Sequence, residues 1–259
     1  MNKKKIYEEI ENIKKIFPFK DYKNSQKDYI DIKTNSHFNI SSNVLQHLEL
    51  GSKVLDIGCG PLDNLSIIKK LGYDCYGVDD HNDPWHNIDD NKSKIYNFAE
   101  KLEIPLFSSI DELQQKFPDL KFDMILLNDI IEHLHNSPRF LFENLNKVLK
   151  VNGLVLITTP NCINLKKRIK VAMGETNYGD YKNFFFHSGD NYRGHIREYS
   201  KKCLEQLCEF TNYEIVKLEG CHQMLNQIPD SMVFLWKIFT SVFPNLKDSF
   251  ILIAKKTNI

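Results

Sequence analysis

Apolar and polar residues follow one another along this chain in blocks whose spacing predicts helices and strands in turn. The first regular blocks run from about residue 37 to residue 78. They predict, in order, a helix from 37 to about Glu49, a strand Lys53–Ile57, a helix that ends at Leu71 before Gly72, and a strand Cys75–Val78. The strands are mostly apolar, which is typical of strands buried on both faces of a sheet.

The same pattern continues towards the C-terminus. It predicts a strand near Ile95–Phe98, a helix Ile110–Phe117, a strand over 122–129, a helix capped by Ser137 and opened by Pro138, and a strand Gly153–Thr159. A helix from Ser200 and two strands, Glu214–Leu218 and Phe250–Ala254, complete the series. Strands that alternate with helices indicate an α/β fold with a parallel sheet covered on both faces.

Three stretches fall outside this regular pattern. Residues 3–16 predict a polar amphipathic helix, and Pro18 with the polar stretch to about residue 35 predicts a loop. We therefore divide the chain into an N-terminal helical extension, 1–36, and one domain, 37–259. We expect substrate-covering insertions near 162–199 and 221–248. The second includes the apolar segment 223–245, which predicts one or two helices and is a candidate lid or homodimer contact.

Composition narrows the classes of partner. Lysine and arginine together number 34, as do aspartate and glutamate, so the formal net charge is zero. Such a balance gives no overall field for nucleic acid or for a membrane surface, so we expect neither partner and favour a small-molecule acceptor. The six cysteines form no CxxC pair and the N-terminus has no signal-peptide pattern, which favours a cytoplasmic protein.

The clearest motif is VLDIGCGPLDNL, residues 54–65. Asp56 ends an apolar strand, and Gly58 and Gly60 turn the chain into a helix, so a ligand can approach the backbone closely. Asp63 stands where the dinucleotide motif GxGxxG has its third glycine, and a carboxylate there would repel a pyrophosphate. Asp79, at the end of the next strand, is placed to accept both hydroxyls of a ribose.

With these residues the chain resembles the class I S-adenosylmethionine-dependent methyltransferases, particularly the ubiquinone-pathway O-methyltransferases and the sugar-modifying enzymes. The resemblance covers about residues 37–220 and includes GLVLITTPN (153–161) and GHIREYS (194–200). It implies a Rossmann-like, doubly wound, mostly parallel seven-stranded sheet with a C-terminal antiparallel strand. It also implies S-adenosylmethionine as cofactor and S-adenosylhomocysteine as product.

The resemblance assigns roles to particular residues. Around the methionine portion it places Asp56, Gly58, Gly60, Asn128 and Asp129; at the ribose it places Asp79; and as weaker candidates for the adenine it gives Asn97 and Phe98. One departure is Leu62, which stands where this family usually has a third small residue. The loop before the helix is therefore expected to have a different shape.

Histidines are the candidate catalytic groups. His133 follows the fourth strand at the edge of the expected cofactor site, and an imidazole suits proton removal near neutral pH. A packing or helix-capping histidine is the alternative. His195 is the second candidate, and Tyr192, Arg193 and Arg197 beside it are expected to orient an anionic or sugar-like acceptor. A loop held by its own hydrogen bonds would explain the same residues.

Two further clusters have simpler explanations. Asp129, Glu132 and His133 resemble the divalent-metal motif of some O-methyltransferases, but three ligands from one turn rarely complete a site, so we expect no metal. The basic run Lys166, Lys167, Arg168 and Lys170 lies on a predicted helix and is typical of a solvated face.

The sequence therefore predicts an S-adenosylmethionine-dependent O-methyltransferase. Its expected acceptor is a sugar or a phosphorylated biosynthetic intermediate, for example in surface polysaccharide biosynthesis. A non-catalytic S-adenosylmethionine-binding module is one alternative. A nicotinamide (NAD)-dependent oxidoreductase is another, which Asp63 disfavours.

Overall fold

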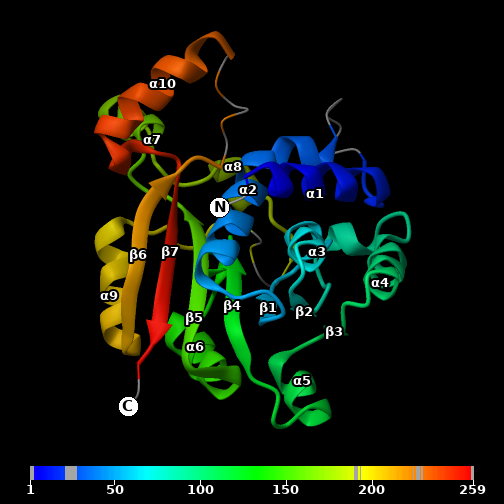
Figure 1. Ribbon diagram of the computed structural model, residues 1–259. Helices are drawn as coiled ribbons and strands as arrows, with labels where there is room; N and C mark the ends of the chain where they lie inside the picture. Colours follow the sequence, from blue (N-terminus) through cyan, green and yellow to red (C-terminus); the bar gives the residue numbers. More distant parts are fainter. Residues whose placement is uncertain are drawn as a thin grey trace.

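The computed structural model describes residues 3–20, 28–189, 192, 194–223, 225, 228 and 230–257. Their centre is a seven-stranded sheet with the strand order β3-β2-β1-β4-β5-β7-β6 (Figure 1). The strands are β1 (Lys53–Ile57), β2 (Asp74–Val78), β3 (Leu106–Phe107), β4 (Phe122–Asn128), β5 (Leu149–Pro160), β6 (Tyr213–Cys221) and β7 (Ser249–Lys256). Strands β1 to β5 pair in parallel, and β7 pairs antiparallel with both β5 and β6. The expected doubly wound fold with a C-terminal antiparallel strand is confirmed.

Helices cover both faces of this sheet. They are α1 (Lys3–Ile16), α2 (Tyr29–His47), α3 (Asp63–Lys70), α4 (Asn91–Lys101), α5 (Ile110–Lys116), α6 (Pro138–Val148), α7 (Leu165–Ala172), α8 (Tyr181–Phe185), α9 (Lys201–Thr211) and α10 (Asp230–Val242). One buried cluster joins α1 to α4 to the sheet, with Ile10, Val44 and Leu65 among its members. A second cluster, which includes Leu113 and Leu145, joins α5, α6 and α9 to the sheet.

The third strand is not where the sequence pattern put it. Residues 95–98 lie in α4, and β3 consists of Leu106–Phe107 alone. Ile95, Phe98, Ala99 and Leu102 are buried together, which is the spacing of one helix face. The expectation of a strand was therefore wrong because a short apolar run was read without its helical neighbours.

The loop expected before residue 36 is also wrong for the described residues 28–35. Helix α2 begins at Tyr29, and the Asp28 side chain caps it by accepting a hydrogen bond from the Ile30 N–H at 2.9 Å. The predicted boundary at 36 and 37 falls inside this helix. Because Ile6 and Ile10 of α1 belong to the cluster that holds α2 and α3, the N-terminal helix packs on the main core.

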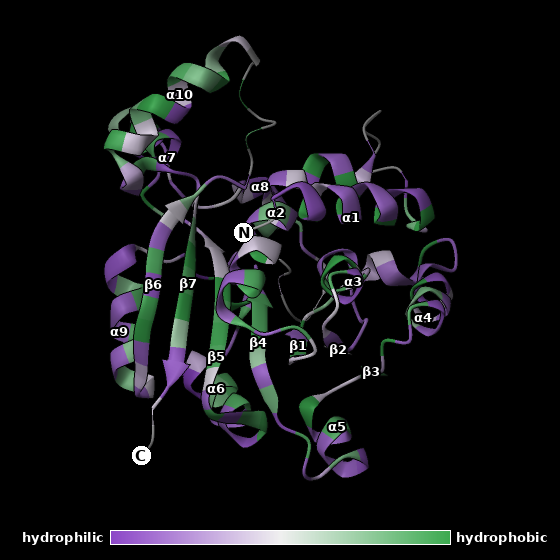
Figure 2. Cartoon of the chain, viewed as in Figure 1, coloured by the Kyte–Doolittle hydropathy of each residue, from purple (hydrophilic) through white to green (hydrophobic). Residues whose placement is uncertain are grey.

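Two helices lie outside the layered core, at the end of the sheet where β5 ends (Figure 1). Helix α7 contributes no buried residue, and α10 follows β6 as the expected apolar insertion. Figure 2 shows α10 as largely hydrophobic although it lies at the periphery. None of the described helices is both long and apolar enough to cross a bilayer.

Candidate functional site

A cavity of about 360 Å³ lies at the carboxyl ends of β1 and β4. The chain passes from β1 to β2 and β3 on one side and to β4 and β5 on the other, so these two strands flank the point where the strand order reverses. Open α/β sheets bind ligands at this point. The cavity is lined by Ile32, Lys33, Ser36, Asp56, Gly58, Cys59, Gly60, Pro61, Asp63, Asn64, Asn128, Asp129, Ile130 and Gln223.

The turn after β1 has a backbone that glycine favours. Gly58 and Gly60 have φ values of 70° and 50°, in the left-handed region. A Cβ atom on Gly58 would lie 2.0 Å from Cδ1 of Ile130, which itself lines the cavity. Leu62 also has a positive φ, 69°, yet its side chain is fully buried. The family that the sequence resembles usually has a small residue at this position. Leu62 instead fixes the turn to the hydrophobic core through its buried side chain.

Asp56 and Asn128 meet on the floor of the cavity. The Asn128 amide donates to Oδ1 of Asp56 at 3.4 Å, and Asp56 is 2% exposed. Burial, together with the carboxylates of Asp63 and Asp79, raises the pKa of Asp56 well above its ordinary value. Oδ1 of Asn128 is buried and has no hydrogen-bond partner among the described residues. A ligand donor at this place would satisfy both side chains.

Asp63 is paired with a cation from α2. Its carboxylate lies 3.2 Å from the Lys33 ammonium, and Nε2 of the buried His37, whose pKa is lowered by burial, lies 3.8 Å away. Burial opposes ionisation of Asp63, but Lys33 outweighs it and keeps the pKa of Asp63 below its ordinary value. Because Lys33 compensates the charge of Asp63, this carboxylate does not by itself exclude a pyrophosphate, contrary to the expectation from the sequence.

Asp79 holds the glycine turn in place. One carboxylate oxygen accepts a hydrogen bond from the Gly60 N–H and the other from the His81 N–H, each at 2.8 Å. Its predicted role at the ribose stays a prediction. The contact shows that Asp79 also fixes the backbone that a ligand would touch.

The two candidates for the adenine lie away from the cavity lining. Phe98 is buried in α4 and packs edge-on against Phe17, with ring centroids 5.6 Å apart. Asn97 is exposed on the same helix. The structure instead brings Lys33 and Ser36 of α2 to the cavity. The polar stretch before residue 36 hid them, although Asp28 was a usable helix-start signal.

Glu132 and two histidines form a second cluster, just after β4. The ligand atoms of Glu132, His133 and His195 lie within 4.8 Å of one another, and no other such group with three or more His, Cys, Asp or Glu residues occurs within the described ranges. His195 therefore takes the place that the sequence motif gave to Asp129. The Asp129 carboxylate instead accepts a hydrogen bond from the Thr158 hydroxyl at 3.2 Å.

Neighbouring groups orient the members of this cluster. Nδ1 of His133 lies 3.2 Å from the Gly194 carbonyl, and Nδ1 of His195 lies 2.7 Å from Glu198. Both contacts assign the proton to Nδ1 and leave Nε2 as an acceptor. The two rings stand edge to face with centroids 4.9 Å apart. The cluster can therefore accept a proton or hold a divalent metal, and its geometry suits either chemistry.

Charge in the cluster is unevenly distributed. Burial and the nearby Asp129 raise the pKa of Glu132 to about 8. One oxygen of Glu132 accepts from the Thr159 hydroxyl at 3.0 Å, and Oε1 is buried without a partner among the described residues. Partial burial and His133 lower the pKa of His195 to about 4, so this imidazole is neutral at physiological pH.

The loop around His195 is held mainly by backbone contacts. The N–H groups of Ile196 and Arg197 both donate to the Glu132 carbonyl, at 2.8 and 3.2 Å. The Tyr192 carbonyl accepts a hydrogen bond from His135 at 2.9 Å, and the Tyr192 ring packs on Phe184. Neither Tyr192 nor Arg197 lines the cavity at the ends of β1 and β4 or the cavity between α7 and α10, so their predicted contact with an acceptor stays a prediction. Arg193 lies outside the described residues.

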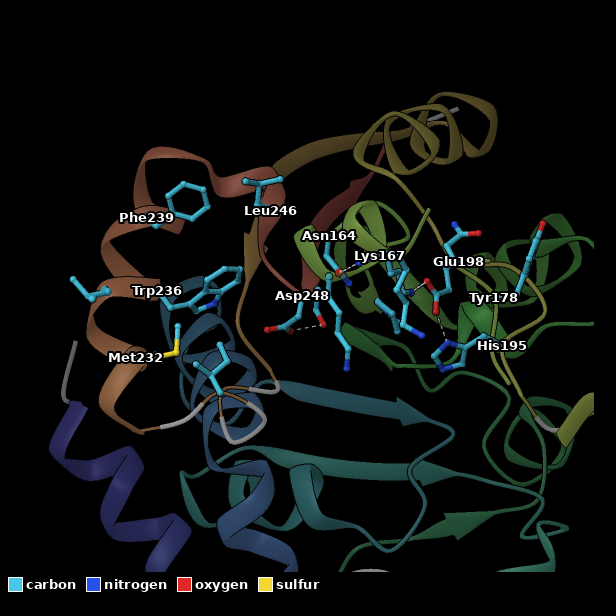
Figure 3. Close-up of a pocket in the computed structure, with 17 residues that line it drawn as sticks. Asn164, Lys167, Tyr178, His195, Glu198, Met232, Trp236, Phe239, Leu246 and Asp248 are labelled. Carbon is cyan, nitrogen blue, oxygen red and sulfur yellow. Dashed lines mark hydrogen bonds and ion pairs between the residues drawn. The ribbon is translucent and has the colours of Figure 1, made fainter. Parts of the chain in front are cut away.

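A larger cavity of about 660 Å³ opens between α7 and α10. Figure 3 shows Met232 and Trp236 on one side and Lys167, Glu198 and His195 on the other. Nε1 of Trp236 is buried and has no hydrogen-bond partner within the described part of the chain.

The two cavities share a wall. Gln223, which lines the smaller cavity, donates its N–H to Asp248 of the larger one at 2.9 Å. Its side chain accepts from the Ser249 hydroxyl at 3.2 Å, and Ser249 also lines the larger cavity. His195 is at the larger cavity and His133 packs against it, so the histidine cluster borders this space. Gln223 could not be identified from residue type or spacing, because its position depends on how β6 and β7 pair.

Comparison with known proteins agrees with this geometry. A family model described as a methyltransferase domain matches residues 19–218. The sequence matches no curated protein.

Solved structures share the fold at low sequence identity. A SAM-dependent methyltransferase from Archaeoglobus fulgidus is 20% identical, with 86% of this chain and 96% of that one covered and a TM-score of 0.52. A cyclopropane-fatty-acyl-phospholipid synthase-like protein from Lactobacillus casei is 11% identical, with 99% and 100% covered and a TM-score of 0.61. The 1,6-didemethyltoxoflavin-N1-methyltransferase of Burkholderia thailandensis, solved with S-adenosylhomocysteine, is 15% identical, with 86% and 79% covered and a TM-score of 0.55.

Proposed function

Since the chain belongs to the methyltransferase domain family, we propose that it transfers a methyl group from S-adenosylmethionine to a small polar acceptor. The observation that carries this proposal is the cavity at the ends of β1 and β4, where a turn with glycine at positions 58 and 60 meets the buried carboxyl group of Asp56. A Cβ on Gly58 would clash with Ile130, which lines this cavity. The turn therefore suits a ligand that presses against bare backbone.

The residues of the cavity fit the charge of this cofactor. Three carboxyl groups, those of Asp56, Asp63 and Asp129, line it, and the lysine of the lining, Lys33, is paired with Asp63. The ammonium and sulfonium of the cofactor would stabilise the ionised form of the other two carboxyl groups, which burial disfavours. When bound, S-adenosylmethionine supplies an electrophilic methyl group. Asp56 and Asn128 would hold its methionine end, and Asp79 would hold both the glycine turn and the ribose.

The acceptor is proposed to enter through the larger cavity. Lys167, Tyr178 and Trp236 line it and offer hydrogen-bond donors to a polar molecule. His133 is placed to take the proton that a hydroxyl acceptor loses, because its Nε2 is left as an acceptor and it packs against His195, which lines this cavity. The low pKa of His195 keeps that imidazole neutral and makes it a weak base. These donors support a sugar or a phosphorylated intermediate as the acceptor class, as in polysaccharide biosynthesis, with oxygen as the methylated atom.

Cofactor binding is tested first. Titration calorimetry should detect binding of S-adenosylmethionine and S-adenosylhomocysteine and none of NAD. Asp79→Ala should weaken the binding of both by at least about tenfold, or 1.4 kcal/mol, because the Gly60 N–H loses its acceptor. Asp119→Ala, an exposed carboxylate, is the matched control and should bind normally. NAD binding alone would replace this proposal with an oxidoreductase.

Turnover is tested separately. S-Adenosylhomocysteine formation would be measured with a panel of sugar phosphates and nucleotide sugars. His133→Ala should lower kcat by about 100-fold while the cofactor affinity stays unchanged. His47→Ala, on α2, is the control. Cofactor binding without turnover on any of these acceptors would contradict the proposed acceptor class and favour a binding module.

A further inference from the structure

Helix α10 exposes an apolar surface that no described part of the chain covers. Its exposed side chains include Phe234 at 71%, Leu235 at 65% and Val242 at 67%. Ile238 and Phe239 are exposed as well. Contiguous apolar surface of this kind on a protein is a sign of an interaction site.

The helix is attached to the core mainly through one polar position. Thr240 is fully buried, and its hydroxyl lies 2.9 Å from Nε2 of His222. Trp236 turns towards the larger cavity (Figure 3). The remaining apolar side chains of α10 therefore contribute little to the core. Burial of apolar area is worth about 25 cal/mol per Å², so exposing this surface loses stabilisation that a partner would restore.

Helix α7, across the larger cavity, adds positive charge to the same surface. Lys166 and Lys170 line the cavity and are exposed. Lys170 lies 3.4 Å from Glu175, whereas Lys166 has no carboxylate within ion-pair distance among the described residues. Two apolar side chains of α7 lie beside Lys170 in the sequence and are also exposed: Ile169 at 50% and Val171 at 54%.

The acids that face this cavity are already engaged. Glu198 contacts both the Lys167 ammonium and His195. Asp248 accepts hydrogen bonds from the Gln223 N–H and the Ser249 hydroxyl, and its other oxygen faces His222. The charge left over on this surface is therefore positive.

Aromatic residues of the adjacent loop extend the surface. Tyr178 lines the same cavity and is 76% exposed, and Tyr181, Phe184 and Phe186 of the following segment are exposed by more than half. Helices α7, α8 and α10 all lie at one end of the molecule (Figure 1). Apolar and aromatic side chains beside lysines are typical of segments that lie in the interface of a membrane.

We propose that the exposed faces of α7 and α10, called here the α7–α10 surface, dock the protein on an anionic lipid bilayer. Lys166 and Lys170 contact lipid phosphates, while Phe234, Leu235 and Ile238 enter the boundary of the acyl chains. The charge favours a bilayer over a second copy of the chain, because an anionic layer of headgroups complements the lysines of α7, whereas a second copy presents the same positive surface. The protein lies on the bilayer in this proposal, and no described helix crosses it.

This inference differs from the expectation of no membrane partner. That expectation rested on a net charge of zero over the whole chain. The structure shows that the positive charges of α7 gather beside an apolar helix, so a local field exists where the total vanishes. The proposal does not depend on methyl transfer.

Sedimentation with lipid vesicles tests the proposal. The full chain should bind vesicles of phosphatidylcholine mixed with phosphatidylglycerol and bind pure phosphatidylcholine at least about tenfold less. Added salt should weaken binding to the mixed vesicles, because it screens the lysines. Lys166→Glu with Lys170→Glu, and separately Phe234→Asp with Ile238→Asp, should each lower binding at least about tenfold.

Matched variants elsewhere control for charge and for an added acid. Lys92→Glu with Lys94→Glu changes two exposed lysines of α4, and Phe140→Asp changes a phenylalanine of α6 that is 50% exposed. These controls should bind vesicles like the unchanged chain. Equal binding to both vesicle types, or binding to neither, would overturn the proposal. So would a dimer in sedimentation velocity that Phe234→Asp dissociates while vesicles are not bound.

Cofactor titration of every variant keeps the two proposals apart. The α7 and α10 variants should bind S-adenosylmethionine normally, because none of these side chains lines the smaller cavity. Normal cofactor binding with absent vesicle binding rejects the docking surface alone. Vesicle binding without cofactor binding rejects the proposed function alone.

Discussion

The smaller cavity at the ends of β1 and β4, called here the cofactor cavity, and the α7–α10 surface lie at the same end of the sheet. The two are nevertheless built in opposite ways. The cavity is formed by side chains that also belong to the core: Asp56 and Asp63 are 2% and 4% exposed, and Leu62 is fully buried beneath the turn. Helix α7 has no buried residue, and α10 is largely exposed. A change at the cavity therefore disturbs the fold, whereas a change on the α7–α10 surface disturbs only what binds there.

This difference separates two tasks. In the proposed function, the cofactor is bound by strand ends and a tight turn that the core determines. In the two proposals, the acceptor and the membrane are contacted by elements that add little to the free energy of unfolding. Such elements can vary in sequence without loss of the fold, which is consistent with solved relatives that share the fold at 11–20% identity.

Gly58→Ala should have the largest effect and tests the comparison most directly. The added Cβ meets Ile130 and the positive φ disfavours alanine, so we expect the unfolding free energy to fall by about 1–3 kcal/mol and cofactor affinity to fall at least about tenfold. Gly174→Ala, at the end of α7, is the matched control because Gly174 has φ 82° with nothing within 4 Å of a Cβ. Its strain of about 1 kcal/mol should be confined to α7, which buries no residue, and leave both Tm and the affinity unchanged. Equal affinity losses in both variants would remove the distinction.

Glu132→Gln should have an intermediate effect that depends on pH. The pKa of Glu132 is raised to about 8 from an ordinary value of 4.5, so in this window the folded protein holds a proton that the unfolded chain releases. The unfolding free energy should therefore fall as pH rises from about 5 to 9. In the Glu132→Gln variant this decrease should be smaller by about 1–3 kcal/mol, because glutamine does not titrate. Denaturation with urea at several pH values measures it.

The control for this pH experiment is Glu175→Gln, at the exposed end of α7. Its stability should follow that of the unchanged chain across the same pH range. Parallel curves for Glu132→Gln and the unchanged chain would show that the Glu132 carboxyl is ionised in the folded protein.

Asn164→Ala should have the smallest effect. The Asn164 side chain caps α7 by accepting from the Lys167 N–H at 3.0 Å. Because α7 buries nothing, we expect faster amide exchange in α7 by about fivefold and no change in Tm. Ser200 caps α9 in the same way at 3.3 Å, but α9 buries Leu204 and Leu207. Ser200→Ala should therefore lower the global unfolding free energy by about 1 kcal/mol. A fall in Tm for Asn164→Ala would show that α7 is part of the core.

Local features of this site could be predicted from the sequence. The strand β1, its glycine turn and the acid at its end are set by neighbours in the chain, so Asp56, Gly58 and Gly60 were identified correctly as parts of one turn. The N-cap Ser137 depends on the next turn of helix and was also found, and the helix expected from Ser200 begins there, with Ser200 as its N-cap. Weak short strands such as β3 offer no comparable pattern.

Contacts between distant parts of the chain could not be predicted. His195 reaches Glu132 only because the loop after β5 returns to the end of β4, where Ile196 and Arg197 donate to the Glu132 carbonyl. Gln223 reaches the cofactor cavity only because β7 pairs with both β5 and β6. Residue type and spacing carry no information about such returns of the chain, so the metal motif was assigned to Asp129 instead of His195.

The position of β7 has a consequence for how the molecule is made. Strand β7 is last in the sequence, yet it pairs with β5 on one edge and with β6 on the other. While the ribosome is still adding residues 249–256, β6 has no strand to join and the outer edge of β5 is unpaired. The nascent polypeptide therefore exposes an aggregation-prone edge until residues 249–256 have been added, and a chaperone that shields such edges would act before that point.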